Sequence, residues 1–336
     1  MNILLTSAGR RVELFECIKE ASLDSIVYTA DTDSIAPTLL VSNKGFTVSS
    51  ITDLNYSSDI LEISKKNKIN GIIPLLDPEL IILSNNQSMF NENKIQLIIS
   101  NQNSIQIAND KVLTFDFFKK IQIKTPTTIE VTNKNISEIE SKIQFPLFIK
   151  PRFGSNSKDV GICKTLEELS FFTSRIDNPI VQENIIGNEV TIDVFGDGTG
   201  NIFSLIPRLR LKIRSGEVER AITINDKLFR DDVIRICKEF KPYGPINIQC
   251  FVTDDGPVFS EINARFGGGY PLSNMAGAKF PELLTDLMNG KKLSNYLGTY
   301  TKGLIMSRYD KGVYQTISNM TDSTWISKIP SNLIKN

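Results

Sequence analysis

The sequence predicts a Rossmann-like α/β domain followed by an α+β region with a large antiparallel sheet. In the first hundred or so residues, short apolar runs alternate with segments of helical periodicity, which is typical of a doubly wound parallel sheet. Farther along, apolar strands follow one another and are joined by turn sequences such as Gly-Asp-Gly at 196–198, which favour antiparallel hairpins. A length of 336 residues also favours more than one domain.

The α/β domain is expected to contain four strands separated by three helices. The strands are expected at 2–6, 25–33, 71–77 and 95–100, and the helices at 10–22, 57–69 and 78–90. Asp77 would end the third strand, where ligands bind in open α/β sheets. Capping of the following helix is the alternative reason for an acid at this position.

The loop after the first strand contains one glycine, Gly9, whereas a dinucleotide fingerprint needs three. The start of the following helix still favours an anion, and Arg10 and Arg11 add positive charge there. A carboxylate or phosphate site and a solvated helix start are both compatible with this loop.

The second half is expected to be mainly strands. A helix at 109–121 with a start signal at Asn109 or Asp110 precedes them. Further helices are expected at 165–176, 226–241 and 279–290. The strands are expected at 145–151, 179–185, 188–198, 200–213, 220–224 and in a hairpin at 244–263.

Composition excludes several kinds of function. The 38 basic and 38 acidic residues cancel, which gives no support to a nucleic-acid or membrane-surface partner. No histidine is present, so histidine bases and histidine-ligated zinc are excluded. The four cysteines are scattered, as expected of reduced thiols in a cytoplasmic protein. The opening apolar run is too short for a signal peptide or a membrane span.

A group of polar residues at 249–265 carries the strongest chemical signal. The hairpin can place Gln249 beside Glu261 and Asn263, and Arg265 continues the same alternation. Carboxylate and amide oxygens are ligands for Mg²⁺, and a nearby arginine suits a phosphoryl group. A surface salt bridge on a sheet is the alternative.

Further polar residues follow earlier strands. Lys150 ends one strand and precedes a turn-rich loop, in which Gly154, Ser155 and Ser157 could wrap phosphates. The next strand runs into Gln182 and Glu183, whose acceptors and exposed backbone suit a purine edge.

In this order, Lys111 in "NDK", Lys150 in "FIKP", the loop, "VQENIIGNE", Gln249 and "EINAR" resemble the ATP-grasp superfamily. The branch is the one close to carbamoyl-phosphate synthase large chains and biotin carboxylase, and the resemblance covers roughly residues 1–295. It implies a pre-ATP-grasp domain at 1–110, a small lid subdomain at 111–185, and a large subdomain with a C-terminal extension at 186–336.

The resemblance also implies a role for each motif residue. ATP would be bound by Lys111, Lys150, Ser155, Ser157, Gln182, Glu183, Asn184, Ile185 and Glu189. One or two Mg²⁺ ions, for which Mn²⁺ can substitute, would be held by Gln249, Glu261 and Asn263. The expected catalytic residues are Arg265, Lys150 and Arg210: Arg265 would contact the transferred phosphoryl group, Lys150 the ATP phosphates, and Arg210 the anionic substrate. The phosphate loop has fewer glycines than is usual in the family, and Gln249 replaces a frequent second acid, which leaves the loop's closure and the number of ions open.

The substrate residues are less specific. Alternation places Arg208, Arg210 and Lys212 on one face of a strand, either as a pocket for an anionic substrate or as a solvated sheet face. The full set of substrate candidates is Arg10, Arg11, Asp77, Glu79, Arg208, Arg214, Gly267 and Gly268. The glycines at 267–269 would let the backbone approach the second substrate closely.

The activity implied by the resemblance is an ATP-dependent carboxylate–amine ligase that forms an acyl phosphate and releases ADP and phosphate. Its substrate would be an amino acid or another small carboxylate, together with an amine acceptor. A phosphotransferase that stops at a phosphorylated product is the alternative, and a non-catalytic nucleotide-binding module is a third. A homodimer is left open.

Overall fold

The structure is a computed structural model that describes residues 1–21, 26–42, 44–132, 135–154, 159–214 and 216–316. The chain divides into two compact units. The first contains Met1–Ile98, Leu284–Lys291 and the segment from Tyr309, and the second contains Ile99–Leu283 and Lys292–Arg308. No helix in the described ranges is long and apolar enough to cross a membrane.

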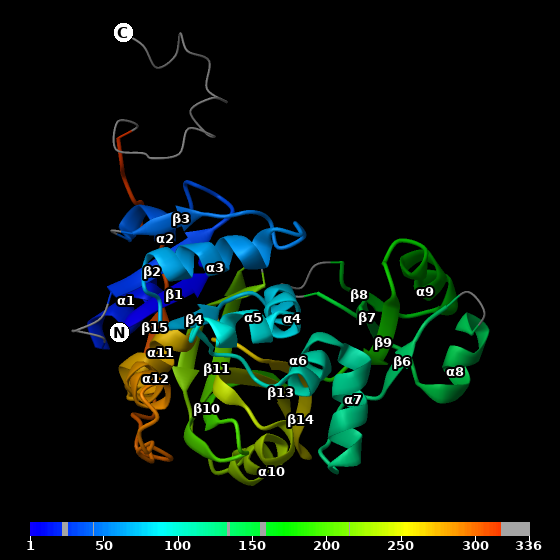
Figure 1. Ribbon diagram of the computed structural model, residues 1–336. Helices are drawn as coiled ribbons and strands as arrows, with labels where there is room; N and C mark the ends of the chain where they lie inside the picture. Colours follow the sequence, from blue (N-terminus) through cyan, green and yellow to red (C-terminus); the bar gives the residue numbers. More distant parts are fainter. Residues whose placement is uncertain (22–25, 43, 133–134, 155–158, 215, 317–336) are drawn as a thin grey trace. The chain divides into compact units, whose positions relative to one another are not determined.

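The first unit contains a parallel five-stranded sheet in the order β3-β2-β1-β4-β5, which confirms the predicted doubly wound domain (Figure 1). Its strands are β1 (Asn2–Thr6), β2 (Ile26–Asp31), β3 (Gly45–Thr47), β4 (Gly71–Pro74) and β5 (Gln96–Leu97). Its helices are α1 (Val12–Ala21), α2 (Pro37–Val41), α3 (Tyr56–Lys66), α4 (Asp77–Asn85) and α5 (Gln87–Glu92).

Asp77 does not end a strand, contrary to the prediction. β4 ends at Pro74, which has no N–H for a further ladder bond, and Asp77 is the first residue of α4. Pro78 in the first turn fits a helix start at this point. The helix expected at 78–90 is also divided, because α4 ends at Asn85 and α5 begins at Gln87.

The second unit contains the predicted large antiparallel sheet, with six strands in the order β14-β13-β10-β11-β12-β15. The strands are β10 (Asn188–Asp197), β11 (Ile202–Arg214), β12 (Glu217–Thr223), β13 (Tyr243–Thr253), β14 (Gly256–Asn263) and β15 (Ile305–Ser307). The expected hairpin is present, since β13 and β14 turn at Asp254 and Asp255.

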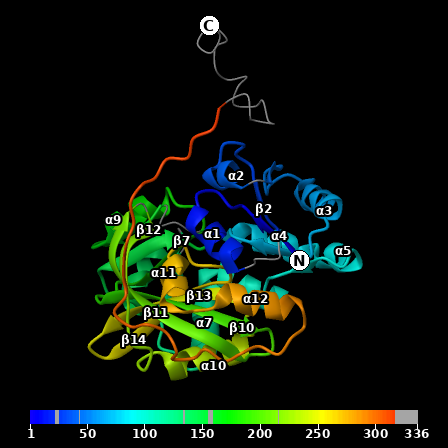
Figure 2. The same cartoon turned by 90° about the vertical axis from the view of Figure 1, so that its left-hand side faces the viewer.

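The two faces of this sheet differ in chemistry. Val190, Ile192 and Val194 of β10 are buried on one face, and Phe259 of β14 lies on the same side. That face is packed by α7 (Lys111–Lys120) and α10 (Arg230–Phe240) (Figure 2), and by α6 (Gln102–Asn109), which contacts β14. The opposite face carries Glu189, Thr191 and Asp193 at alternate positions of the same strand.

A smaller antiparallel sheet, in the order β6-β9-β7-β8, completes the second unit (Figure 1). Its strands are β6 (Thr128–Glu130), β7 (Leu147–Pro151), β8 (Gly161–Cys163) and β9 (Pro179–Glu183). Two helices, α8 (Ile139–Lys142) and α9 (Leu166–Thr173), pack on it around Ile139, Leu169 and Cys163.

The sequence did not reveal α6 or α11 (Tyr270–Ala276). α6 is capped by the Asn101 side chain, which accepts from the Ser104 amide, but its polar sequence shows no clear apolar period. α12 (Phe280–Met288) lies within the helix predicted at 279–290.

Candidate active site

The β13–β14 hairpin places the proposed metal ligands together. Gln249 and Glu261 are direct partners across the two strands, and Asn247 pairs with Asn263 one row along the same face. The register shifts after Gln249, so that Ser260 is an extra residue and Cys250 pairs with Phe259. This bulge keeps Glu261 beside Gln249 while the apolar residues of β14 remain on the other face.

Hydrogen bonds orient the amide side chains in this hairpin. Asn263 Nδ2 donates to Asn247 Oδ1 over 3.2 Å, and Asn247 Nδ2 donates to the Arg265 carbonyl over 3.1 Å. Arg265 Nη2 then donates to Asn263 Oδ1 over 3.2 Å. Arg265 lies just beyond the end of β14, so the expected side-by-side arrangement of Asn263 and Arg265 is present. Asn247 was missed in the sequence, because a regular register from the turn would place it opposite Ile262 and the bulge at Ser260 places it opposite Asn263 instead.

This set of proposed ligands contains one carboxylate and two amides, and oxygen donors of this kind suit a hard divalent cation. Among the residues that the structure describes, no group of three or more cysteine, aspartate and glutamate side chains could hold a metal ion. Glu261 supplies one carboxylate, and Gln249 and Asn263 supply amide oxygens. One or two carboxylates completed by phosphate oxygens is the usual environment of Mg²⁺ beside a nucleotide.

Two lysines lie near this carboxylate. Lys111 is the first residue of α7, and Lys150 lies on β7; both are buried, at 9% and 8% exposure. Burial lowers the pKa of Lys150 to about 8, with the Glu261 carboxylate opposing the shift and the Lys111 ammonium adding to it. Lys150 is therefore close enough to interact electrostatically with both Glu261 and Lys111 in the folded protein.

The lowered pKa predicts that an anionic phosphate binds Lys150 less well above pH 8. Above this pH the charged fraction of the lysine falls about tenfold per pH unit. We therefore expect the Kd for MgADP, measured by calorimetry between pH 7 and 9.5, to rise above pH 8 and approach that slope. K150R should remove this rise because arginine stays protonated over the whole range. A K150R protein with the same pH dependence as wild type would contradict the assignment.

The strand proposed for adenine recognition is held at its end. Gln182 is buried, and its Nε2 donates to Thr128 Oγ1 over 2.7 Å. Glu183 is exposed, and its carboxylate accepts from the Thr127 amide over 2.8 Å. Asn184 and Ile185 are half-buried. Ser155 and Ser157 lie outside the described residues.

Glu189 and Arg210 form an ion pair across β10 and β11. Burial raises the pKa of the Glu189 carboxyl, and Arg210 opposes that shift. Arg210 also donates through Nη2 to the Gly216 carbonyl over 3.2 Å. The proposed ribose ligand and the proposed substrate arginine are therefore paired with each other in this structure.

Arg208 is enclosed in the second unit. It is 1% exposed, and its Nε and Nη2 donate to the buried Asp193 carboxylate over 2.7 and 3.1 Å. Ser273 of α11 donates to the same carboxylate over 2.5 Å. Lys212 was predicted to share a face with Arg208 and Arg210. The regular alternation that this prediction assumes is interrupted, because the β11–β12 register shifts between Arg210 and Lys212. Arg214, at the end of β11, is exposed.

Two of the three consecutive glycines make room for this buried pair. A Cβ at Gly269 would lie 2.2 Å from Arg208 Nη1, and one at Gly267 would lie 2.9 Å from Asp193 Oδ1. A Cβ at Gly268 would have nothing within 4 Å. The side chains of Asp193 and Arg208 therefore occupy the space beside Gly267 and Gly269, where the sequence led us to expect a substrate.

In the first unit, the Asp31 carboxylate lies at the loop where the sequence analysis considered an anion site. The Gly9 amide donates to Asp31 Oδ2 over 2.7 Å, so this backbone donor is already used. Arg10 is exposed and lies 3.9 Å from Asp310, and Arg11 is half-buried. Glu79 is fully buried and accepts from the Tyr56 hydroxyl over 2.5 Å, and burial raises the pKa of its carboxyl. Its side chain thus reaches no solvent.

Two segments of the chain match known protein families. Residues 3–98 match a model described as the PylC-like N-terminal domain, and residues 108–269 match the ATP-grasp domain. Among curated proteins, a carbamoyl-phosphate synthase of Methanobrevibacter smithii is 24% identical over 199 residues, which are 58% of this chain and 52% of the relative. The carbamoyl phosphate synthase large chain of Clostridium perfringens is 25% identical over 292 residues, 77% of this chain and 26% of the relative. This chain therefore spans about half of the first relative and about a quarter of the second.

Solved structures share the fold at low identity. The biotin carboxylase domain of Hydrogenobacter thermophilus 2-oxoglutarate carboxylase has a TM-score of 0.71 and 16% identity, covering 90% of this chain and 73% of the other. An L-amino acid ligase from Bacillus licheniformis has a TM-score of 0.68 and 17% identity, covering 87% and 75%. The family matches and these relatives lead to one conclusion: the chain contains an ATP-grasp domain at residues 108–269, and it is similar in sequence to carbamoyl-phosphate synthases and in fold to a biotin carboxylase domain.

Proposed function

We propose that this chain is an ATP-dependent ligase that joins a small carboxylate to an amine through an acyl phosphate, releasing ADP and phosphate. The observation that carries the proposal is the grouping of Lys111, Lys150 and Glu261 within the part of the chain that matches the ATP-grasp domain. Two cations and one carboxylate at the ends of different elements suit a Mg²⁺-bound triphosphate.

Each residue of the group has a distinct task in this proposal. Lys111 and Lys150 bind the phosphates, and Gln249, Glu261 and Asn263 would hold Mg²⁺, which neutralises charge on the triphosphate when bound. Arg265, oriented by Asn263, stabilises the charge that develops on the transferred phosphoryl group. A carboxylate nucleophile needs no base to attack phosphorus, which agrees with a chain that lacks histidine.

The remaining nucleotide contacts follow the family pattern. The backbone and side chains of 182–185 would read adenine, Glu189 would bind ribose, and Ser155 and Ser157 would contact phosphate. In the same proposal, residues 111–185, which include the four-stranded sheet, act as the lid subdomain.

The proposed acid substrate is an amino acid or a similar small carboxylate. Support comes from the fold shared with an L-amino acid ligase. Gly268 remains a substrate candidate, because the space beside it is open. The other remaining substrate candidates are Arg10, Arg11, Asp77 and Arg214.

ADP release tests this function directly. Purified protein with Mg²⁺ and ATP would be supplied with a panel of amino acids and other carboxylates, each with and without an amine. We expect ADP release only when an acid and an amine are both present, with a new amide detected by mass spectrometry. Release with a single substrate and no amine would instead support a phosphotransferase. Bound ATP that is never turned over by an acid and amine would contradict the ligase.

A further inference from the structure

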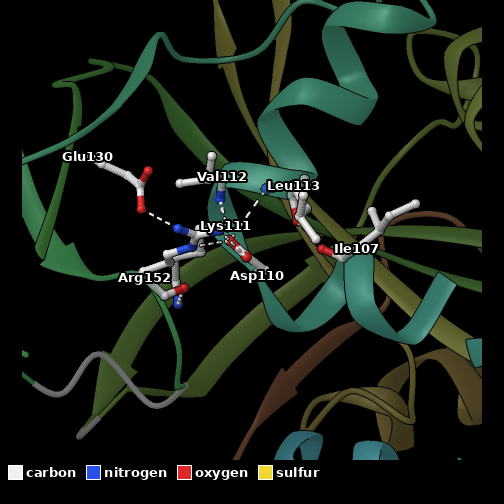
Figure 3. A network of polar contacts seen from close by, with 8 residues as sticks. Ile107, Asp110, Lys111, Val112, Leu113, Glu130 and Arg152 are labelled. Atoms are coloured by element: carbon white, nitrogen blue, oxygen red, sulfur yellow. Dashed lines mark hydrogen bonds and ion pairs between the residues drawn. The ribbon is translucent and has the colours of Figure 1, made fainter. Parts of the chain in front are cut away.

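A partly buried ion pair joins Asp110, at the start of α7, to Arg152, the residue after β7, next to Lys111 (Figure 3). Arg152 Nε donates to Asp110 Oδ1 over 2.8 Å, and Arg152 Nη2 donates to Asp110 Oδ2 over 2.6 Å. The third arm, Nη1, contacts the half-exposed Glu130 carboxylate at the end of β6. Two-pronged arginine–carboxylate pairs fix the relative orientation of both groups.

Asp110 performs a second task at the same time. Its Oδ1 accepts from the amides of Val112 and Leu113 over 2.9 and 3.4 Å, and so caps α7. One carboxylate thus fixes both the first turn of the helix and the guanidinium of Arg152. Lys111 lies between Asp110 and the capped amides, so its backbone is held within this network.

The backbone that follows β7 holds the Lys111 side chain. Lys111 Nζ donates to the Gly154 carbonyl over 2.9 Å and to the Arg152 carbonyl over 3.3 Å, and the Lys111 amide donates to the same Arg152 carbonyl over 3.3 Å. The Arg152 amide donates to the Asn178 carbonyl over 2.9 Å. The position of the Lys111 ammonium therefore depends on where the Arg152 backbone lies.

The two lysines come from different layers of the second unit. α7 packs on the six-stranded sheet through Phe118, whose ring centroid lies 6.2 Å from that of Phe259. Lys150 belongs to the four-stranded sheet, where β7 pairs with β8 and β9 on both sides. Burial is the main cause of the lowered pKa of Lys150, and the Lys111 ammonium adds to it, because the two cations repel each other.

We propose that Arg152 is a positioning residue that fixes the Lys111 ammonium for the nucleotide phosphates by binding Asp110. This inference rests on the proposed function, because it assigns Lys111 to phosphate binding. Arg152 itself need not touch the nucleotide. Its effect on nucleotide affinity is transmitted through Lys111.

A double-mutant cycle tests this route. We expect R152Q to weaken MgADP binding about tenfold and K111M to weaken it by at least as much. In the K111M background, R152Q should cause less than about a twofold further loss, because the residue through which it acts is already gone. R152K keeps the charge without the two-pronged geometry, and should lie between wild type and R152Q.

The controls separate positioning from stability. R235Q makes the same substitution at a partly exposed arginine that bonds Asp232 on α10, and should leave the Kd unchanged. Equal losses from R152Q in the two backgrounds would overturn the inference while leaving the nucleotide site intact. If R152Q does not fold, the R152K and R152K/K111M pair gives the same comparison. If wild-type protein does not bind MgADP, the proposed function fails, and this inference fails with it.

Discussion

The substitution E261Q is expected to lower ADP release by about a thousandfold or more while leaving the fold intact. Glu261 supplies the only carboxylate among the three proposed metal ligands, and it pairs directly with Gln249 on the neighbouring strand. The Glu261 carboxylate also opposes the lowering of the Lys150 pKa by burial, so the E261Q substitution removes a negative charge from beside a buried cation. Initial rates over a range of Mg²⁺ concentrations, with a melting curve for each protein, would measure both effects.

The matched control is E138Q, which removes a carboxylate from an exposed pair with Lys142 in the second unit. That change is expected to alter the rate by less than about twofold. Normal turnover by E261Q at every Mg²⁺ concentration would exclude Glu261 as a metal ligand. A large loss of melting temperature in E261Q would indicate a structural role for the carboxylate instead.

The substitution D193A is expected to destabilise the protein by about 3–5 kcal/mol, because it leaves Arg208 buried without its partner. Both residues are 1% exposed, and the Asp193 carboxylate accepts from Arg208 and from Ser273. The guanidinium has no route to solvent at its present position in β11. Urea unfolding followed by circular dichroism would give the change in free energy.

The comparison protein is D193L/R208M, in which both charges are replaced by apolar side chains. Removing both members of a buried ion pair is often close to neutral, so this double variant should be more stable than D193A. If the two variants unfold at the same urea concentration, the loss in D193A comes from packing and not from an unpaired charge. G268A would serve as a reference substitution for the unfolding measurement, because its added Cβ meets no neighbouring atom within 4 Å.

Local signals in the sequence predicted the parts of the site that lie close together along the chain. The Asp254–Asp255 turn predicts the hairpin, but a regular register from this turn would pair Gln249 with Ser260, and it is the bulge at Ser260 that brings Glu261 beside Gln249. The start of α7 was predicted in the same way, because Asp110 is a good helix cap. These features depend on short-range geometry that a sequence displays directly.

Pairings between distant segments could not be predicted in this way. Arg208 reads as a solvent-facing arginine until the β10–β11 register places it beside Asp193. The role of Gly269 depends on that same arginine, which lies far away in the sequence. Glu79 was similarly predicted to line the substrate pocket, but the fold buries it against Tyr56.

The first unit takes one of its parts from far along the chain. Leu284–Lys291 belongs to it, and a Cβ at Gly71 of β4 would lie 2.1 Å from Met288 Cε. Gln96 Nε2 also donates to the Met288 carbonyl over 3.2 Å. A gene fragment that stopped at codon 98 would therefore encode the sheet without residues 284–291, whose Met288 packs against β4. For the same reason, exchanging this domain between homologues as an N-terminal cassette would require transplanting residues 284–291 as well.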